Sequence, residues 1–361
     1  MTNNSFSHNF PAIRGNQSGR PSYIAMCPMR IVPKLFRFDE DDVPPELRAQ
    51  RTLNRSRIPE IAAYLVDNSK DYTLSSLTAS VNSNIHFEPF SDTGIGQNMG
   101  TIFIPMDAQI LINDGQHRRA AIEEAIKENP ELGHDNISVL FFIDEGLARS
   151  QQMFADLNKH AIRPGDSIST LYDLRDTISE LGRYIQEHVR VFSRLTELEK
   201  SSLSNRSTKL FTLSSIKNAN KALLRKAKKD DTTKAEKKLA VEYWNEVAAS
   251  MPDWQLALNK EISTKELREN YVHAHAVSLQ ALGQIGADLL AKPEPKWKRA
   301  LKILKGIDWA RSNKDWEGRA MNLGRMSNTR VNVTLTGNYI KNKMKIPLNA
   351  AEEAMEKDYQ K

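Results

Sequence analysis

Apolar and polar residues follow two different periods along this chain, and the change of period divides it into two parts. In the first part, short apolar runs bounded by turn residues are typical of strands. These runs cover residues 23–30, 74–81, 101–105, 108–112 and 137–143. Apolar positions at helical spacing cover residues 46–54, 58–66, 120–126 and 147–159. Strands and helices mixed in this order predict an α/β domain over residues 23–165.

The strand pattern ends near Ser167, and helical spacing dominates from there on. Residues 1–22 are rich in Asn, Ser, Gly and Pro without any period, so we expect a flexible arm there. Pro164 and Gly165 mark a boundary, and residues 166–361 are expected to form a mostly helical domain. The predicted fold class is therefore α+β, with a mixed α/β domain followed by a helical one. The expected helices cover residues 170–191, 213–229, 234–251, 263–290 and 296–305.

The distribution of charge adds a functional expectation for the helical domain. The net charge is +6, but residues 1–216 hold 23 basic and 27 acidic side chains and total −4. Residues 217–238 total +6 and residues 291–345 total +10, while residues 239–290 total −4 and the tail −2. Two basic blocks in one half are typical of a nucleic-acid-binding module attached to another domain. Lysine-rich helices that merely face solvent are the alternative.

Composition limits the class of protein further. Hydrophobic residues make up 40% and charged residues 27%, as in ordinary globular proteins. No apolar run approaches the ~18 residues that a membrane span needs, and the N-terminus lacks a secretion signal. The single cysteine, Cys27, excludes an internal disulfide and is expected to be a small core residue. We expect a soluble cytoplasmic protein that contacts no membrane.

The strongest chemical signal lies where one predicted strand turns into a helix. An apolar strand end and a turn of Asn, Asp and Gly occupy residues 110–115, and His117, Arg118 and Arg119 follow in the first helical turn. Free N–H groups at a helix start, beside these cations, suit a phosphate group. Cations at the positive end of a helix dipole also suggest that an anion binds there. The alternative is that Asp114 caps the helix and the arginines face solvent.

The string Asp114-Gly115-Gln116-His117-Arg118 resembles the motif of DGQHR-domain proteins, and the chain is similar to the DNA sulfur modification protein DndB family. The similarity includes residues 51–61 upstream and 152–161 downstream, and extends over roughly residues 20–345. It implies a ParB/sulfiredoxin-like nucleotide-binding core in the α/β domain. It also implies a role beside DNA phosphorothioate modification, where the family is best known as a DNA-binding regulator.

The same resemblance places the second motif, residues 152–161, close to the DGQHR turn. Asp114 and Asp156, with Asp144 as a further candidate, are then expected to bind Mg²⁺, which takes carboxylates together with phosphate oxygens. The expected cofactor is ATP or another NTP with Mg²⁺. Basic residues that complement a helix C-terminus are the alternative for the second motif. The candidate nucleotide-binding residues are Gly115, Arg119, Asn158, Lys159, His160 and Arg163.

A catalytic role is a further hypothesis for the DGQHR turn. The candidate catalytic residues are Asp114, Gln116, His117 and Arg118, with His117 as the acid or base because its ordinary pKa of ~6.5 lies near neutral pH. Hydrogen bonding of His117 to a phosphate fits as well. No P-loop string occurs, so a P-loop NTPase is excluded.

Candidate DNA contacts lie in the two basic blocks. The helix expected from residue 213 begins with Ser214 and Ser215, suits phosphates and base edges, and is a candidate recognition helix. The second block adds Trp316 and Tyr339 for stacking on bases. The candidate DNA-binding residues are Lys217, Lys221, Arg225, Lys226, Lys228, Lys229, Arg325 and Arg330.

Three functions follow from these observations. The first is a regulator that binds double-stranded DNA, as a repressor of the modification genes, with a nucleotide or phosphate at the DGQHR turn. The second is an ATPase coupled to DNA nicking. The third is an adaptor that binds other DNA sulfur modification proteins, and a homo-oligomer is compatible with each.

Overall fold

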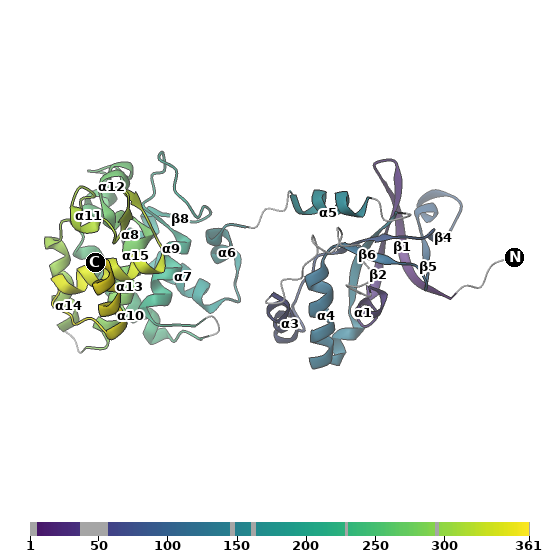
Figure 1. The fold of residues 1–361 in the computed structure, drawn as a ribbon, viewed down its shortest axis with the longest axis horizontal. Coiled ribbons are helices and arrows are strands. Elements are labelled where there is room, and N and C mark those ends of the chain that lie inside the picture. The colour runs from purple at the N-terminus through teal and green to yellow at the C-terminus, as the bar shows by residue number, and fades with distance from the viewer. Residues whose placement is uncertain are drawn as a thin grey trace. The chain divides into compact units, whose positions relative to one another are not determined.

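The computed structural model describes residues 6–36, 57–144, 149–159, 164–227, 230–292 and 296–360 (Figure 1). Contacts within the chain divide it into two compact units, residues 1–162 and residues 163–361. The first unit mixes strands and helices and the second is mostly helical, which confirms the predicted fold class. The unit boundary lies three residues before the predicted one.

The first unit is built on one seven-stranded sheet. Its order is β4-β5-β1-β2-β7-β3-β6, and neighbours are antiparallel except for the parallel pair β3 and β7. Figure 1 shows α1, α3 and α4 on one side of the sheet, while α5 packs against β6 on the other. The strands are β1 (Ser7–Gln17), β2 (Arg20–Pro28), β3 (Leu77–Val81), β4 (His86–Pro89), β5 (Met99–Pro105), β6 (Ile110–Asp114) and β7 (Asn136–Ile143). The helices are α1 (Val32–Leu35), α3 (Ile58–Asp67), α4 (Gln116–Glu128) and α5 (Ser150–Lys159), with 3₁₀ turns at Gly94–Asn98 and Pro130–His134.

The predicted flexible arm is wrong for the part of it that the structure describes. Residues 7–17 form β1, which pairs with β2 on one side and β5 on the other. Phe10 and Ala12 are buried on alternate positions, as expected of a strand with one covered face. Composition suggested a loop because it registers local preference only, whereas β1 is held by β5, about 90 residues later.

The other elements near the DGQHR turn agree with the sequence. Helix α3 covers the predicted residues 58–66, and α4 buries Ala121, Ile122 and Ala125 on one face. Strand β7 buries alternate residues against the same core. Cys27 is 0% exposed, and burial raises the pKa of its thiol to about 12, so it is a core residue as predicted. The helix expected over residues 46–54 lies outside the described residues.

The second unit packs its helices around a core of large aromatic residues that includes Trp244, Trp254 and Trp316. Helices α7 and α13 pack on α9, and Gly283 allows close approach because a Cβ there would lie 2.2 Å from the Ala219 oxygen. The helices are α6 (Asp166–Tyr172), α7 (Thr177–His188), α8 (Arg190–Leu195), α9 (Leu213–Leu223), α10 (Lys234–Ala249), α11 (Pro252–Leu258), α12 (Thr264–Asn270), α13 (Ala276–Leu290), α14 (Lys296–Leu301), α15 (Arg330–Lys343) and α16 (Ala350–Tyr359). The short strands are β8 (Thr196–Glu197), β9 (Phe211–Thr212), β10 (Met321–Asn322) and β11 (Arg325–Met326), and 3₁₀ turns lie at Val272–Ala274, Lys302–Gly306 and Lys314–Trp316.

Three of the predicted long helices are shorter than expected. The helix over 170–191 is interrupted, because α6 ends at Tyr172 and a new helix, α7, begins where Asp176 caps it by accepting from the N–H of Ser179. The helix over 213–229 ends at Leu223, and Arg225 follows with a φ of 51°. The helix over 263–290 is broken where the chain pairs with residues 309–311. Within the described parts of the chain, no helix has the length and hydropathy of a membrane span.

Candidate functional site

The DGQHR turn depends on the glycine at its centre. Gly115 has a φ of 104° and precedes α4, and a Cβ there would lie 2.3 Å from Cδ2 of Leu77. A side chain is therefore disfavoured twice, by the left-handed backbone and by the contact with β3. Asp114 does not cap the helix and instead accepts a hydrogen bond from Arg118 at 2.5 Å.

Both arginines of the turn bind groups of the chain itself. Arg118 donates to the Ser75 carbonyl at 3.1 Å and to the Ser75 hydroxyl, in addition to its ion pair with Asp114. Arg119 donates to the carbonyls of Pro33 and Phe36 and pairs with a carboxylate on its own helix, Glu123. Asp114 and Glu123 thus balance the charge of these arginines, and binding of a phosphate beside them stays a prediction. The arginines tie the turn to segments before β3 and after α1.

Two other motif residues, Gln116 and His117, stand at the first turn of α4. Gln116 donates through Nε2 to the Ile112 carbonyl at 3.3 Å, which closes the turn onto β6. Burial, together with the positive charge of Arg57, lowers the pKa of His117 below its ordinary value. The imidazole is therefore mostly neutral at pH 7 and can accept a proton. A catalytic or phosphate-binding role of this turn stays a prediction.

The carboxylates expected to bind Mg²⁺ are only partly brought together. Asp114 lies opposite Thr78 at one end of β3, whereas the Asp144 N–H donates to Val81 at the other end. These positions are roughly 10 Å apart along the strand, so Asp114 and Asp144 cannot share an ion. Asp144 instead accepts from the N–H of Arg149, immediately before α5.

The second motif lies on α5, which packs against β6, the strand that leads into the DGQHR turn. Asp156 is exposed and accepts from Gln152 at 2.6 Å. The side chains of Asn158 and Lys159, and all of His160 and Arg163, lie outside the described parts of the chain. Where side chains are described, no three His, Cys, Asp or Glu residues converge as a metal site.

The candidate recognition helix is wrong, because α9 is a core helix. Ser214 and Ser215 are buried at the start of the helix, where the N–H of Ser215 donates to the Thr212 hydroxyl. Asn220 is 0% exposed and accepts a hydrogen bond from the Trp244 indole at 2.9 Å. Lys217 is half-buried, and its Cβ and backbone line the space beside Gly182 of α7. Lys221 and Asn218 are exposed, whereas Ser214 and Ser215, which were expected to contact phosphates and base edges, are buried and cannot reach them.

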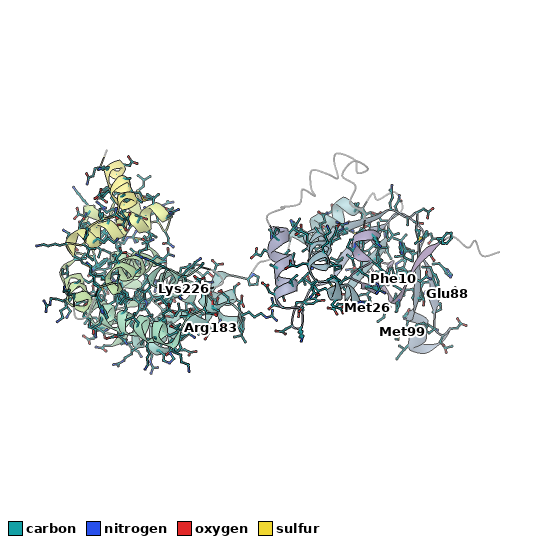
Figure 2. The ribbon with its side chains drawn as sticks, turned by 90° about the horizontal axis from the view of Figure 1, so that it is seen from below. Phe10, Met26, Glu88, Met99, Arg183 and Lys226 are labelled. Carbon is teal, nitrogen blue, oxygen red and sulfur yellow. The ribbon has the colours of Figure 1, made fainter. Side chains whose placement is uncertain are left out.

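Two further cations of the first basic block, Arg225 and Lys226, have acidic partners within the second unit. Arg225 pairs with Asp288, and Lys226, labelled in Figure 2, pairs with Glu236 at 2.7 Å. The partner of Arg225 could not be predicted from the sequence, since Asp288 follows Arg225 by 63 residues. Lys228 and Lys229 lie outside the described residues.

Much of the second basic block is also internal. Arg319 forms a buried ion pair with Glu356, and Lys341 pairs with Asp288 at 2.5 Å and Glu352 at 2.6 Å. Trp316 is 0% exposed and Tyr339 is 9% exposed, so the prediction that they stack on bases is wrong. These groups fasten α16 to the unit.

Two predicted DNA contacts remain exposed beside a hairpin. Strands β10 and β11 present Leu323, 96% exposed, at their turn, with Arg325 after it and Arg330 at the start of α15. Arg311 supports the turn by donating to the Gly324 carbonyl at 2.8 Å. Neither Arg325 nor Arg330 has an ion-pair partner among the side chains that the structure describes. We call Leu323, Arg325 and Arg330 the basic hairpin surface.

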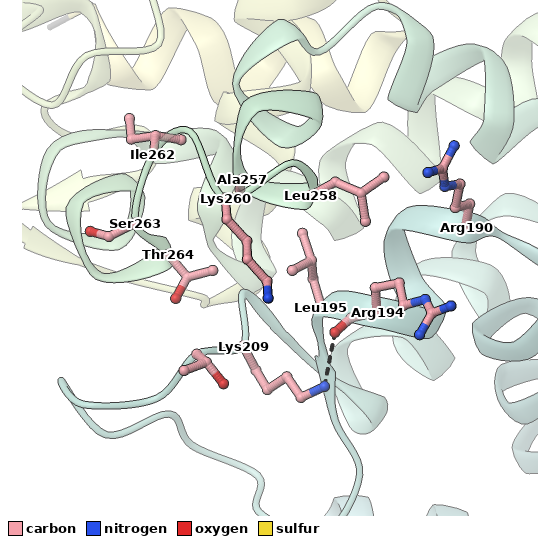
Figure 3. A pocket seen from close by; sticks show the side chains of 11 residues that line it. Arg190, Arg194, Leu195, Lys209, Ala257, Leu258, Lys260, Ile262, Ser263 and Thr264 are labelled. Atoms are coloured by element: carbon pink, nitrogen blue, oxygen red, sulfur yellow. Dashed lines mark hydrogen bonds between the residues drawn. The ribbon is translucent and has the colours of Figure 1, made fainter.

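The sequence analysis missed a basic pocket elsewhere in the second unit. This cavity has a volume of about 700 Å³, and its lining includes four cationic side chains, which Figure 3 labels: Arg190, Arg194, Lys209 and Lys260. These residues are scattered over 71 positions outside both basic blocks, so neither charge counting nor motif reading could find them. They meet because α8, the chain before β9 and the end of α11 are adjacent.

Comparison with known proteins identifies the relationship of the chain. A family model described as DndB, DNA-sulfur modification-associated, matches residues 10–347 and thus covers both units. No curated protein and no solved structure matches the chain. The expectation of a ParB/sulfiredoxin-like core therefore stays a prediction.

Proposed function

The chain belongs to the DndB family and has a role in the DNA sulfur modification system, and we propose that within this system it is a DNA-binding regulator. In this proposal the helical unit binds double-stranded DNA and represses transcription of the modification genes. The observation that carries it is the difference in charge between the units. Residues 163–361 hold 36 basic and 25 acidic side chains, net +11, whereas residues 1–162 hold 15 and 20, net −5.

The basic hairpin surface is the proposed contact with DNA. Arg325 and Arg330 are exposed and lack acidic partners among the described residues, so binding a phosphate breaks no ion pair. Arg330 also lies in the first turn of a 14-residue helix, where main-chain N–H groups suit a phosphate. Leu323 stands at the hairpin turn as an apolar side chain that can contact base edges or sugars. Cationic side chains around an apolar tip match a nucleic-acid groove better than an acidic or apolar partner.

Binding of a labelled duplex from the promoter of the modification genes tests the proposal, with fluorescence anisotropy measured from 50 to 300 mM salt. The Arg325→Gln/Arg330→Gln variant removes two phosphate contacts, so we expect affinity to fall at least about tenfold and the salt slope to fall by about two. Arg20→Gln/Lys70→Gln removes two exposed charges from the first unit and should bind like wild type. Equal affinity of the hairpin variant and wild type would remove this surface from the proposal.

The ATPase and adaptor hypotheses stay predictions. Phosphate release by wild type and by His117→Ala, measured with ATP and Mg²⁺, tests the first of them. No contact among the described residues favours either over DNA binding.

A further inference from the structure

The basic pocket of the helical unit is a second candidate site, separate from the DGQHR turn and from the basic hairpin surface. Its lining includes Arg190, Arg194, Lys209 and Lys260 and contains no acidic residue (Figure 3). Among the described side chains, none of the four cations has an ion-pair partner. Four like charges around one cavity repel each other and focus a positive potential into it, which an anionic ligand relieves.

A hydrogen bond within the chain holds one of the four cationic side chains, Lys209, in place. Lys209 donates through Nζ to the Arg194 carbonyl at 2.8 Å, which joins two of the four. The loop that carries Lys209 is gathered by Arg268, whose guanidinium donates to the carbonyls of Ser204, Ser207 and Lys209. Thr264 of α12 donates to the Ser207 carbonyl as well, at 3.0 Å. The loop that carries Lys209 is thus held in place, which lowers the cost of ordering this side of the pocket on binding.

Lys260 occupies its place at a conformational cost. Its φ is 63°, in the left-handed region that ends α11, where the N–H of Glu261 donates to the Leu256 carbonyl. Glycine is the usual residue in such a helix ending, because a Cβ is disfavoured there. Arg225 and Lys345 follow α9 and α15 with similar values of φ, so this conformation fixes the place of Lys260 at the rim of the pocket and does not by itself indicate binding.

We propose that the pocket binds a free nucleotide, with its phosphates against the four cations. Leu195, Leu258 and Ile262 form an apolar wall that suits the base, and the hydroxyl of Ser263 can donate to a phosphate or sugar oxygen. The volume of about 700 Å³ lies within the range of small-ligand sites. A phosphate of the DNA backbone offers the same charge, but a concave cavity fits a small ligand better than a convex duplex.

The residues that line the pocket also bear on whether nucleotide binding there requires Mg²⁺. Because no carboxylate lines the pocket, the protein supplies no ligand for a divalent cation there, and the four cationic side chains neutralise the phosphates instead, so we expect binding without Mg²⁺. Nucleotide binding at the DGQHR turn was expected to use Mg²⁺ at Asp114 and Asp156. The two sites are therefore distinguished by their response to a chelator.

Calorimetric titration of the full chain with ATP, dAMP and pyrophosphate, each in EDTA, tests the proposal. We expect ATP to bind wild type, and Arg194→Gln/Lys260→Gly to bind it at least about tenfold more weakly because two charged hydrogen bonds are lost. Lys302→Gln/Lys305→Gln removes two exposed charges elsewhere in the unit and should bind like wild type. Lys260→Gly alone should weaken binding while its Tm stays equal or rises, which separates a lost contact from misfolding.

The same variants in the duplex anisotropy assay distinguish the two phosphate sources. Pocket variants that lose ATP but keep the duplex support the proposal, whatever the hairpin variant does. Pocket variants that lose the duplex while wild type binds no nucleotide would show a contact with the DNA backbone and overturn it. ATP binding that needs Mg²⁺, or that the pocket variants leave intact, would also overturn it.

Discussion

The arginines of the DGQHR turn and the cations of the basic pocket differ in what surrounds them. Arg118 and Arg119 each contact main-chain carbonyls and a carboxylate, so their charges hold segments of the first unit together. Arg190 and Arg194 of the pocket are exposed and have no such partner among the described side chains. The arginines of the DGQHR motif, the more prominent signal in the sequence, therefore already have partners within the fold. Cations ready for a ligand are those that the fold leaves without an acid.

The largest expected effect concerns the glycine on which the DGQHR turn depends. Gly115→Ala should lower the free energy of unfolding of the first unit by roughly 3 to 4 kcal/mol, because the cost of the left-handed backbone adds to the cost of the clash with Leu77. Gly94 also has a positive φ, at the ordinary left-handed value of 64°, and no atom lies within 4 Å of an added Cβ, so Gly94→Ala should cost about 1 kcal/mol. Urea unfolding of both variants measures the difference. Equal costs would show that Leu77 moves aside freely.

The next largest expected effect is the dependence of the helical unit's stability on pH. Burial lowers the pKa of His275 to about 4, and the ring donates to the Arg268 carbonyl at 2.8 Å. Since the unfolded chain binds this proton near pH 6.5 and the folded one does not, stability is full above pH 6.5 and falls as the pH drops toward 4. The helical unit should lose up to about 3 kcal/mol over this window. Urea unfolding at pH 7, 5.5 and 4.5 measures it, and His275→Gln should flatten the profile.

Replacing one arginine in each region tests directly whether the two regions differ in this way. Arg118→Ala leaves the Ser75 carbonyl and Asp114 without their donor, so we expect a loss of about 2 kcal/mol in stability. Arg194→Ala removes a side chain without a described partner and should change stability by less than about 0.5 kcal/mol. Thermal unfolding of both variants, with ATP titration in EDTA, should show opposite patterns. A stable Arg118→Ala variant that has lost nucleotide binding would reverse the roles assigned to the two regions.

Local chemistry explains which parts of the site could be predicted. Asp114-Gly115 after an apolar strand end gave the turn, since only glycine tolerates that backbone, and the helical spacing of Ala121, Ile122 and Ala125 gave α4. The partners of Arg118 and Arg119 could not be predicted, because Ser75 and Pro33 are 43 and 86 residues away. Arg325 and Arg330 were two of the eight basic residues predicted to bind DNA, and nothing in the sequence indicated that these two would be exposed without an acidic partner.

The sequence by itself determined the change from mixed to helical structure, the turn at Gly115 and the excess of positive charge in the second unit. Each of these follows from local preference or composition. Tertiary structure alone decided that residues 7–17 are a strand, that α9 is buried, and which cations keep a free charge. Pairing of strands and of charges depends on residues far apart in the chain. The pocket lined by Arg190, Arg194, Lys209 and Lys260 exists only because the fold brings those residues together.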